Sequence, residues 1–139
     1  MPELPDVEVY IFHLRRRVVG QVLTQVRVAS PFLVRSFDPP LREAHGKGVE
    51  GVRRMGKRVV FDLEGDLHLV LHLMIAGRLR WRDPGTAVPK KVGLAAFDFP
   101  EGTLVLTEAS PKKRASLYVV RGEAAVRALD PGGIEPFDA

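Results

Sequence analysis

The first residues of the chain, Met1-Pro2-Glu3, combine groups that could perform covalent chemistry. Removal of the initiator methionine, which a small following residue such as proline usually permits, turns Pro2 into a secondary α-amine. Such an amine titrates near pH ~8, and the positive end of a following helix lowers its pKa further. Attack of this amine on a sugar aldehyde carbon gives an iminium, which acidifies the adjacent carbon and promotes elimination. The alternative is a proline with no chemical role.

Glu3 is the natural proton carrier beside that amine. General acid–base catalysis needs a group within hydrogen-bond reach of the reacting atoms, and an adjacent residue satisfies that condition. Asp6 could support the same chemistry. Each acid also has a structural alternative, because acidic residues in a first helical turn stabilise the helix without reacting. The pattern therefore indicates a reactive N-terminus without establishing it.

Basic side chains gather in clusters in the central part of the chain. The net charge is +4 and the isoelectric point is near 9.8, which favours a polyanionic partner. Residues 53–58, RRMGKR, hold four basic side chains in six positions. Arginine at every second position places Arg78, Arg80 and Arg82 on one face of a strand. With further clusters at 90–91 and 112–114, the chain predicts a phosphate-binding surface. The alternative is a set of solvated faces.

Composition argues against disulfides, metal and cofactor sites, membrane helices and a secretory signal in this chain. The chain has no cysteine, which excludes disulfides and thiolate zinc sites within it. Its four histidines lack a metal-ligand spacing, so we expect neither a metal nor a cofactor in this chain. No run approaches the ~18 apolar residues of a membrane helix, and the acidic start is unlike a secretory signal. We expect a cytoplasmic monomer, associated with the nucleoid if the source is bacterial.

The element that positions the N-terminal groups is a helix over residues 4–20. Pro5 suits the first helical turn, and Gly20 suits the C-terminal stop. Apolar residues recur at helical spacing and predict a core-facing stripe made of Val7, Ile11, Leu14 and Val18. Residues 21–29 then alternate, which predicts one strand with Val22, Thr24, Val26 and Val28 on one face.

Short alternating segments dominate the rest of the chain. Turns at 64–66 and 100–102 predict hairpins, residues 83–91 predict a loop, and a short helix begins near 122. The fold class is therefore mainly β with flanking helices: a two-layer antiparallel β-sandwich of six to eight strands with an N-terminal α-helix. Residues 1–130 form one domain, and the Pro- and Gly-rich residues 131–139 are where an interdomain linker would begin. The expected strands are 21–29, 49–55, 58–64, 67–75, 77–82, 92–99, 103–109 and 115–121.

Four stretches along the chain carry a family resemblance: PELPDVE (2–8), RRMGKRVVFDL (53–63), LHLMIAGRLRW (71–81) and LDPGGIEPFDA (129–139). In this order they resemble the formamidopyrimidine-DNA glycosylase / endonuclease VIII family of base-excision repair enzymes. The resemblance implies a bifunctional glycosylase with abasic-site lyase activity, which acts on oxidised bases in damaged double-stranded DNA.

The resemblance also implies a role for individual residues. Pro2 is the expected nucleophile on the deoxyribose C1′, and Glu3 is the acid/base that assists ring opening and base release. Lys57 corresponds to the essential lysine of the family and contacts DNA phosphate, and His72 helps to hold a phosphate near the lesion. The other DNA-binding residues that we predict are Lys113, Arg114, Ile75, Arg54 and Arg78.

Three departures from the family pattern bear on lesion recognition. Asp6 stands where glutamate is usual, and Ile75 falls where the family's void-filling methionine is expected, with Met74 displaced by one position. The loop Asp-Pro-Arg-Arg-Phe-Gly becomes SPKKRAS at 110–116, so Arg114 or Lys113 takes the place of the arginine that fills the gap left by the flipped base. The aromatic wedge has no counterpart, because Ala115 follows Arg114.

In the family, a helix–two-turn–helix module and usually a zinc finger follow this domain. The chain stops at Ala139, so we expect that half, with its zinc, to be absent here, and the isolated domain to bind DNA weakly. Two alternatives remain open at this point. One is a relative that binds DNA or lesions with little or no catalysis, and the other is a basic β-sandwich interaction domain without a nucleic-acid partner.

Overall fold

Two antiparallel sheets form the body of the protein, whose computed structural model describes residues 4–130, with side chains from residue 7 onward. One sheet has the strand order β1-β3-β4-β5-β9 and the other has the order β2-β7-β8-β6. The first contains β1 (Val22–Leu23), β3 (Lys47–Met55), β4 (Arg58–Leu63), β5 (Leu67–His72) and β9 (Ser116–Arg121). The second contains β2 (Gln25–Val28), β6 (Gly77–Arg82), β7 (Gly93–Phe99) and β8 (Gly102–Glu108).

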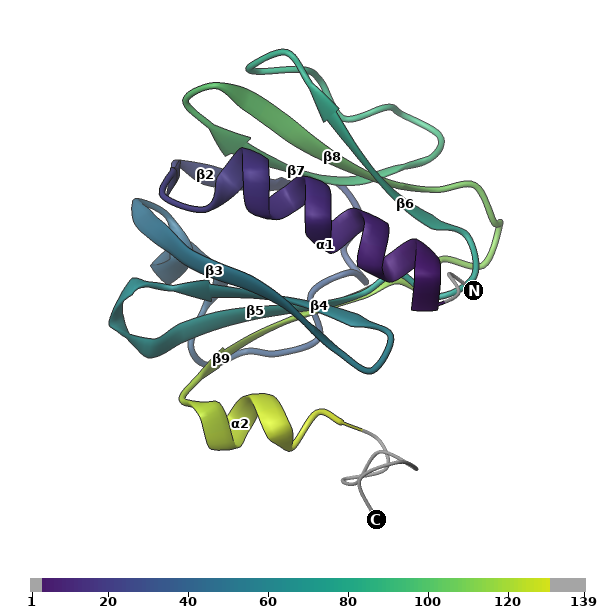
Figure 1. The fold of residues 1–139 in the computed structure, drawn as a ribbon. Coiled ribbons are helices and arrows are strands. Elements are labelled where there is room, and N and C mark those ends of the chain that lie inside the picture. Colours follow the sequence, from purple (N-terminus) through teal and green to yellow (C-terminus); the bar gives the residue numbers. More distant parts are fainter. Residues whose placement is uncertain (1–3, 131–139) are drawn as a thin grey trace.

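The helix α1 (Leu4–Val18) lies along one side of the sandwich, across both sheets (Figure 1). The predicted stripe of four apolar residues is buried, with exposed fractions between 0% and 4%. Across the core, the rings of Phe61 and Phe97 stack with centroids 6.0 Å apart, which joins the two sheets. The predicted mainly β sandwich with an N-terminal helix is therefore confirmed.

The strand predicted over residues 21–29 is divided in the structure. The chain leaves the first sheet after Leu23 and enters the second sheet at Gln25. Leu23 and Val26 are buried, whereas Val22 and Val28 are exposed, so the four residues predicted to share one face of a single strand do not share one. The two-residue period restarts at Thr24, whose backbone N–H and hydroxyl both donate to the Asp98 carbonyl. This division gives nine strands within the described residues.

Three short helical segments complete the described part of the chain. The turn η1 (Leu41–Ala44) precedes β3, and η2 (Glu64–Asp66) closes the predicted β4–β5 hairpin. The helix α2 (Glu123–Arg127) packs Val126 on the outer face of the first sheet, against Val60 and Val70. No helix among residues 4–130 is long and apolar enough to cross a membrane.

Candidate functional site

Strand register brings three of the predicted regions to one edge of the sandwich. Arg58 pairs with His72, and His72 pairs with Ser116, so the β3–β4 turn, the end of β5 and the start of β9 are neighbours. In the other sheet, Gly77 pairs with Glu108, which places the β5–β6 and β8–β9 connections beside each other. We call this set of connections the loop edge of the sandwich.

The helix α1 is tied to the loop edge by an ion pair. Arg54 Nε lies 2.7 Å from Glu8 Oε1, and Arg54 Nη1 donates to the Gly56 carbonyl at 2.9 Å. Arg54 therefore joins the first half of α1 to the turn that carries Lys57, rather than projecting alone into solvent. Of the predicted catalytic groups, Pro2 and Glu3 lie outside the described residues, and Asp6 lies in α1 with its side chain outside them.

His72 is the most perturbed titratable group at the loop edge. Burial lowers its pKa to about 4, and the charges of Arg58 and Lys57 act in the same direction. The ring is therefore neutral at pH 7. Its Nε2 atom is buried and has no hydrogen-bond partner among the described residues. A neutral imidazole in this position offers a directed donor or acceptor, not a positive charge, to a bound group.

His68, on the same strand, is in the opposite situation. Its Nδ1 lies 2.6 Å from Asp62 Oδ1, and its Nε2 lies 2.8 Å from Asp66 Oδ1. Both ring nitrogens of His68 are thus used within the protein, which is typical of a structural histidine. Among the described residues, no group of three or more His, Asp or Glu side chains could hold a metal ion.

The connection between β5 and β6 presents an apolar tip. Ile75 is 59% exposed, and Met74 before it has a positive φ of 59°. The turn is closed by a hydrogen bond from Gly77 N–H to the Leu73 carbonyl, so the strand predicted over 67–75 ends at His72. Arg78 donates to the carbonyls of Ile75 and Gly77. Arg78 therefore holds the tip in place, and Ile75 points an exposed side chain away from the core.

The β8–β9 connection separates the two candidates for the gap-filling cation. Lys113 Nζ donates to the backbone carbonyls of Glu108 and Ser110, so its charge is used inside its own loop. Arg114 is exposed. Its backbone N–H and that of the buried Ala115 both donate to Glu108 Oε1, at 2.8 and 3.2 Å. Geometry thus favours Arg114 over Lys113 as the side chain available to a ligand.

Two residues at the loop edge were missed by sequence reasoning. Glu108 is only 1% exposed, and its carboxylate fixes the backbone that precedes β9. The available signal was an acid that ends the apolar run 103–108, where a buried acid needs partners. Arg58 lowers the pKa of His72, a contact that depends on pairing between strands and has no signature in local sequence.

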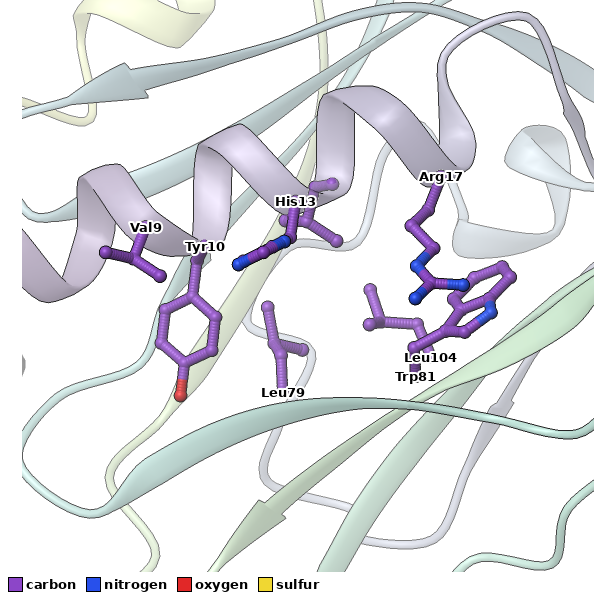
Figure 2. Close-up of a pocket in the computed structure, with 8 residues that line it drawn as sticks. Val9, Tyr10, His13, Arg17, Leu79, Trp81 and Leu104 are labelled. Carbon is purple, nitrogen blue, oxygen red and sulfur yellow. The ribbon is translucent and has the colours of Figure 1, made fainter.

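A separate pocket of about 240 Å³ lies between α1 and the second sheet. Figure 2 shows Tyr10, His13 and Arg17 of α1 facing Leu79, Trp81 and Leu104 of β6 and β8. The Arg17 guanidinium lies 5.6 Å from the centre of the Trp81 ring, within range of a cation–π contact. The pocket is mostly apolar and shares no lining residue with the loop edge described above.

The sequence of this chain matches those of known DNA glycosylases. The profile described as the formamidopyrimidine-DNA glycosylase N-terminal domain matches residues 1–117. A formamidopyrimidine-DNA glycosylase of Listeria monocytogenes serovar 1/2a is 33% identical over 142 residues, covering 99% of this chain and 50% of the relative. The corresponding protein of Corynebacterium jeikeium is 37% identical over 101 residues, covering 69% and 34%.

Solved structures agree with the sequence matches. The Lactococcus lactis Fpg in complex with DNA containing an abasic site superimposes with a TM-score of 0.83 at 25% identity, covering 96% of this chain and 49% of that one. The same protein with DNA containing Fapy-dG gives a TM-score of 0.84 at 25% identity, covering 96% and 50%. This chain spans between 30% and 50% of the length of the curated relatives that it matches.

Proposed function

Because this chain belongs to the formamidopyrimidine-DNA glycosylase family, we propose that it is the N-terminal catalytic domain of a DNA glycosylase with abasic-site lyase activity. Its substrate is damaged duplex DNA that contains an oxidised base. The Lactococcus lactis Fpg, which has the same fold, has been solved in complex with DNA that contains an abasic site and with DNA that contains Fapy-dG, which supports this choice of substrate. The proposed place of action is the cytoplasm, where bacterial DNA lies, and the domain acts as a monomer.

The observation that carries the proposal is the composition of the loop edge. A neutral His72 with a buried, unpartnered Nε2 lies beside the cationic side chains of Lys57 and Arg58. The exposed side chains of Ile75 and Arg114 project from the two neighbouring connections. Cations and a directed imidazole suit phosphate contacts, and an apolar tip with an arginine suits the space left by an extruded base.

The chemical step is assigned to the N-terminus. After removal of Met1, the amine of Pro2 forms a bond to the deoxyribose C1′ as the glycosidic bond to the base breaks. Glu3 supplies a proton as the sugar ring opens, and the amine nitrogen becomes the iminium. The Glu3 carboxylate, which gave up its proton in the previous step, then takes a proton from C2′, and the electrons of that C–H bond form the C2′–C3′ double bond and expel the 3′ phosphate in a β-elimination. Water hydrolyses the iminium and restores the amine.

Borohydride trapping tests this assignment, because reduction converts the iminium into a stable covalent amine. We expect the processed protein to form an adduct with duplex DNA that contains an abasic site. Mass spectrometry of the digested adduct should place the DNA on the peptide that begins at Pro2. An uncleavable extension before Pro2 turns the amine into an amide and should abolish trapping, whereas an equal extension after Ala139 should not. Adduct formation on an internal lysine would refute the assignment.

A second candidate function, a DNA- or lesion-binding module with weak or no catalysis, has one observation in its favour. Ala115, which follows the exposed Arg114, is 2% exposed, so the β8–β9 connection presents no aromatic wedge. Flipping a nucleotide costs a few kcal/mol, which wedges offset. Tight binding to lesion-containing duplex without any trapped adduct, from protein with a confirmed Pro2 N-terminus, would select this alternative.

A further inference from the structure

A cationic groove begins beside the loop edge and runs over the outer face of the second sheet. Its volume is about 390 Å³, and Arg78, Arg80 and Arg82 line one side of it. These side chains come from alternate positions of β6, whereas Leu79 and Trp81 between them point toward α1. The row predicted from the spacing of the arginines therefore exists on one face of β6, and it faces a groove.

The opposite side of the groove is the connection between β6 and β7, which folds back over the sheet. Thr86, Ala87 and Pro89 of this connection line the groove. Its position is fixed by two hydrogen bonds: Arg27 Nη2 donates to the Thr86 carbonyl at 2.8 Å, and Gly85 N–H donates to Thr103 Oγ1 at 2.9 Å. The wall of the groove is thus held in place by hydrogen bonds to β2 and β8.

Charge in the groove is of one sign. Among the described residues that line it, three are arginines and none is acidic. Arg80 and Arg82 are exposed and have no ion-pair partner within the described part of the chain. Lys90 and Lys91, in the connection that forms the opposite wall, are exposed as well. Such a groove attracts a polyanion more strongly than an isolated phosphate.

The position of the groove relative to the loop edge indicates which polyanion it binds. Its lining includes Ala76 and Arg78, and Arg78 also holds the Ile75 tip of the loop edge. From there, the arginine row extends away from the loop edge for ~13 Å, the length of four strand residues. This length is sufficient to face more than one phosphate of a single DNA backbone.

We propose that the groove binds the sugar-phosphate backbone of the DNA that flanks the lesion, and so adds a contact outside the site of chemistry. This inference rests on the proposed function, because it takes the same duplex as the ligand. Threonine and valine side chains floor the groove and offer no base-reading pattern, so the contact should not depend on the flanking sequence.

The test compares Arg80→Gln/Arg82→Gln with the parent chain on uncleaved duplexes that carry a reduced abasic site. One duplex has long arms, and the other is trimmed to the base pairs around the lesion. Each lost phosphate contact lowers the slope of log K against log salt by ~0.9, so we expect a slope reduced by ~1.8 on the long duplex. The short duplex should bind both proteins with the same slope.

Arg16→Gln/Arg42→Gln is the matched control. It removes the same charge from two exposed arginines that do not line the groove, and should leave the slope on the long duplex close to that of the parent chain. An equal loss on both duplexes, an equal loss in the control, or no dependence on arm length in the parent would each overturn the proposal. Borohydride trapping on the short duplex is scored separately, so a failure of the catalytic assignment is distinguishable from a failure of the groove.

Discussion

The unusual protonation of His72 gives a prediction with a definite sign. The pKa of its imidazole is lowered from 6.5 to about 4, mainly by burial and then by Arg58 and Lys57. As the pH falls below 6.5, His72 becomes protonated in the unfolded chain while it is still neutral in the folded chain. Stability should therefore fall between pH 6.5 and pH 4, and this contribution should be constant above and below that window.

The magnitude follows from the size of the shift. At ~1.4 kcal/mol per pKa unit, a shift to about 4 corresponds to a ceiling of ~3 kcal/mol. The ring is only half-buried, and solvent screens part of the interaction, so we expect ~1.5 kcal/mol. Glutamine cannot titrate in this range. Between pH 7 and pH 4, the free energy of unfolding should therefore fall by ~1.5 kcal/mol less in His72→Gln than in the parent chain.

Urea denaturation at several pH values measures this difference, and NMR titration of the histidine ring reports the pKa of His72 directly. His13→Gln is the matched control, because the ring of His13 is exposed on α1 and distant in sequence from the loop edge. Arg58→Gln should raise the pKa of His72 only part of the way, since burial is the larger cause. A pKa of His72 near 6.5, or a constant difference between parent and His72→Gln across this range, would refute the reasoning.

Two further predictions concern the loop edge. A Cβ at position 77 would lie 2.2 Å from the Leu73 carbonyl oxygen, so Gly77→Ala should cost at least ~1–3 kcal/mol of unfolding free energy and move the Ile75 tip. Gly85→Ala should cost less, because a Cβ at position 85 meets no atom within 4 Å, although the φ of Gly85 is positive. Glu108→Ala removes the acceptor of the buried Ala115 N–H and should lower the free energy of unfolding, measured by urea denaturation, by ~2–3 kcal/mol. Glu108→Gln keeps a side-chain acceptor and should lower it less. Equal losses of unfolding free energy in the two Glu108 variants would contradict this role.

Local patterns in the sequence determined much of the fold. The spacing of Val7, Ile11, Leu14 and Val18 was sufficient to predict both a helix and its buried face, because helical neighbours three and four apart share one side. The turn signals at 64–66 and 100–102 predicted two hairpins that the structure confirms. The alternation of arginine along residues 78–82 likewise predicted the exposed row on β6. All of these features depend on contacts between residues close in sequence.

Tertiary structure decided which side chains are available to a ligand. Arg54, Arg78 and Lys113 were predicted as DNA-binding residues, and in the structure each is engaged by Glu8 or by backbone carbonyls of a neighbouring turn. The neutral state of His72 likewise depends on its burial and on Arg58, which only strand pairing brings beside it.

The exchange of sheets at Thr24 follows the same principle. An alternating pattern specifies a strand but not its partner, so the sequence of 21–29 could not show that one half pairs with β3 and the other with β7. Residue types and their spacing thus determined the family, the elements and the candidate chemistry of the N-terminus. Pairing between segments far apart in the chain determined the loop edge and the groove, because burial, charge proximity and hydrogen-bond partners are set by neighbours in space.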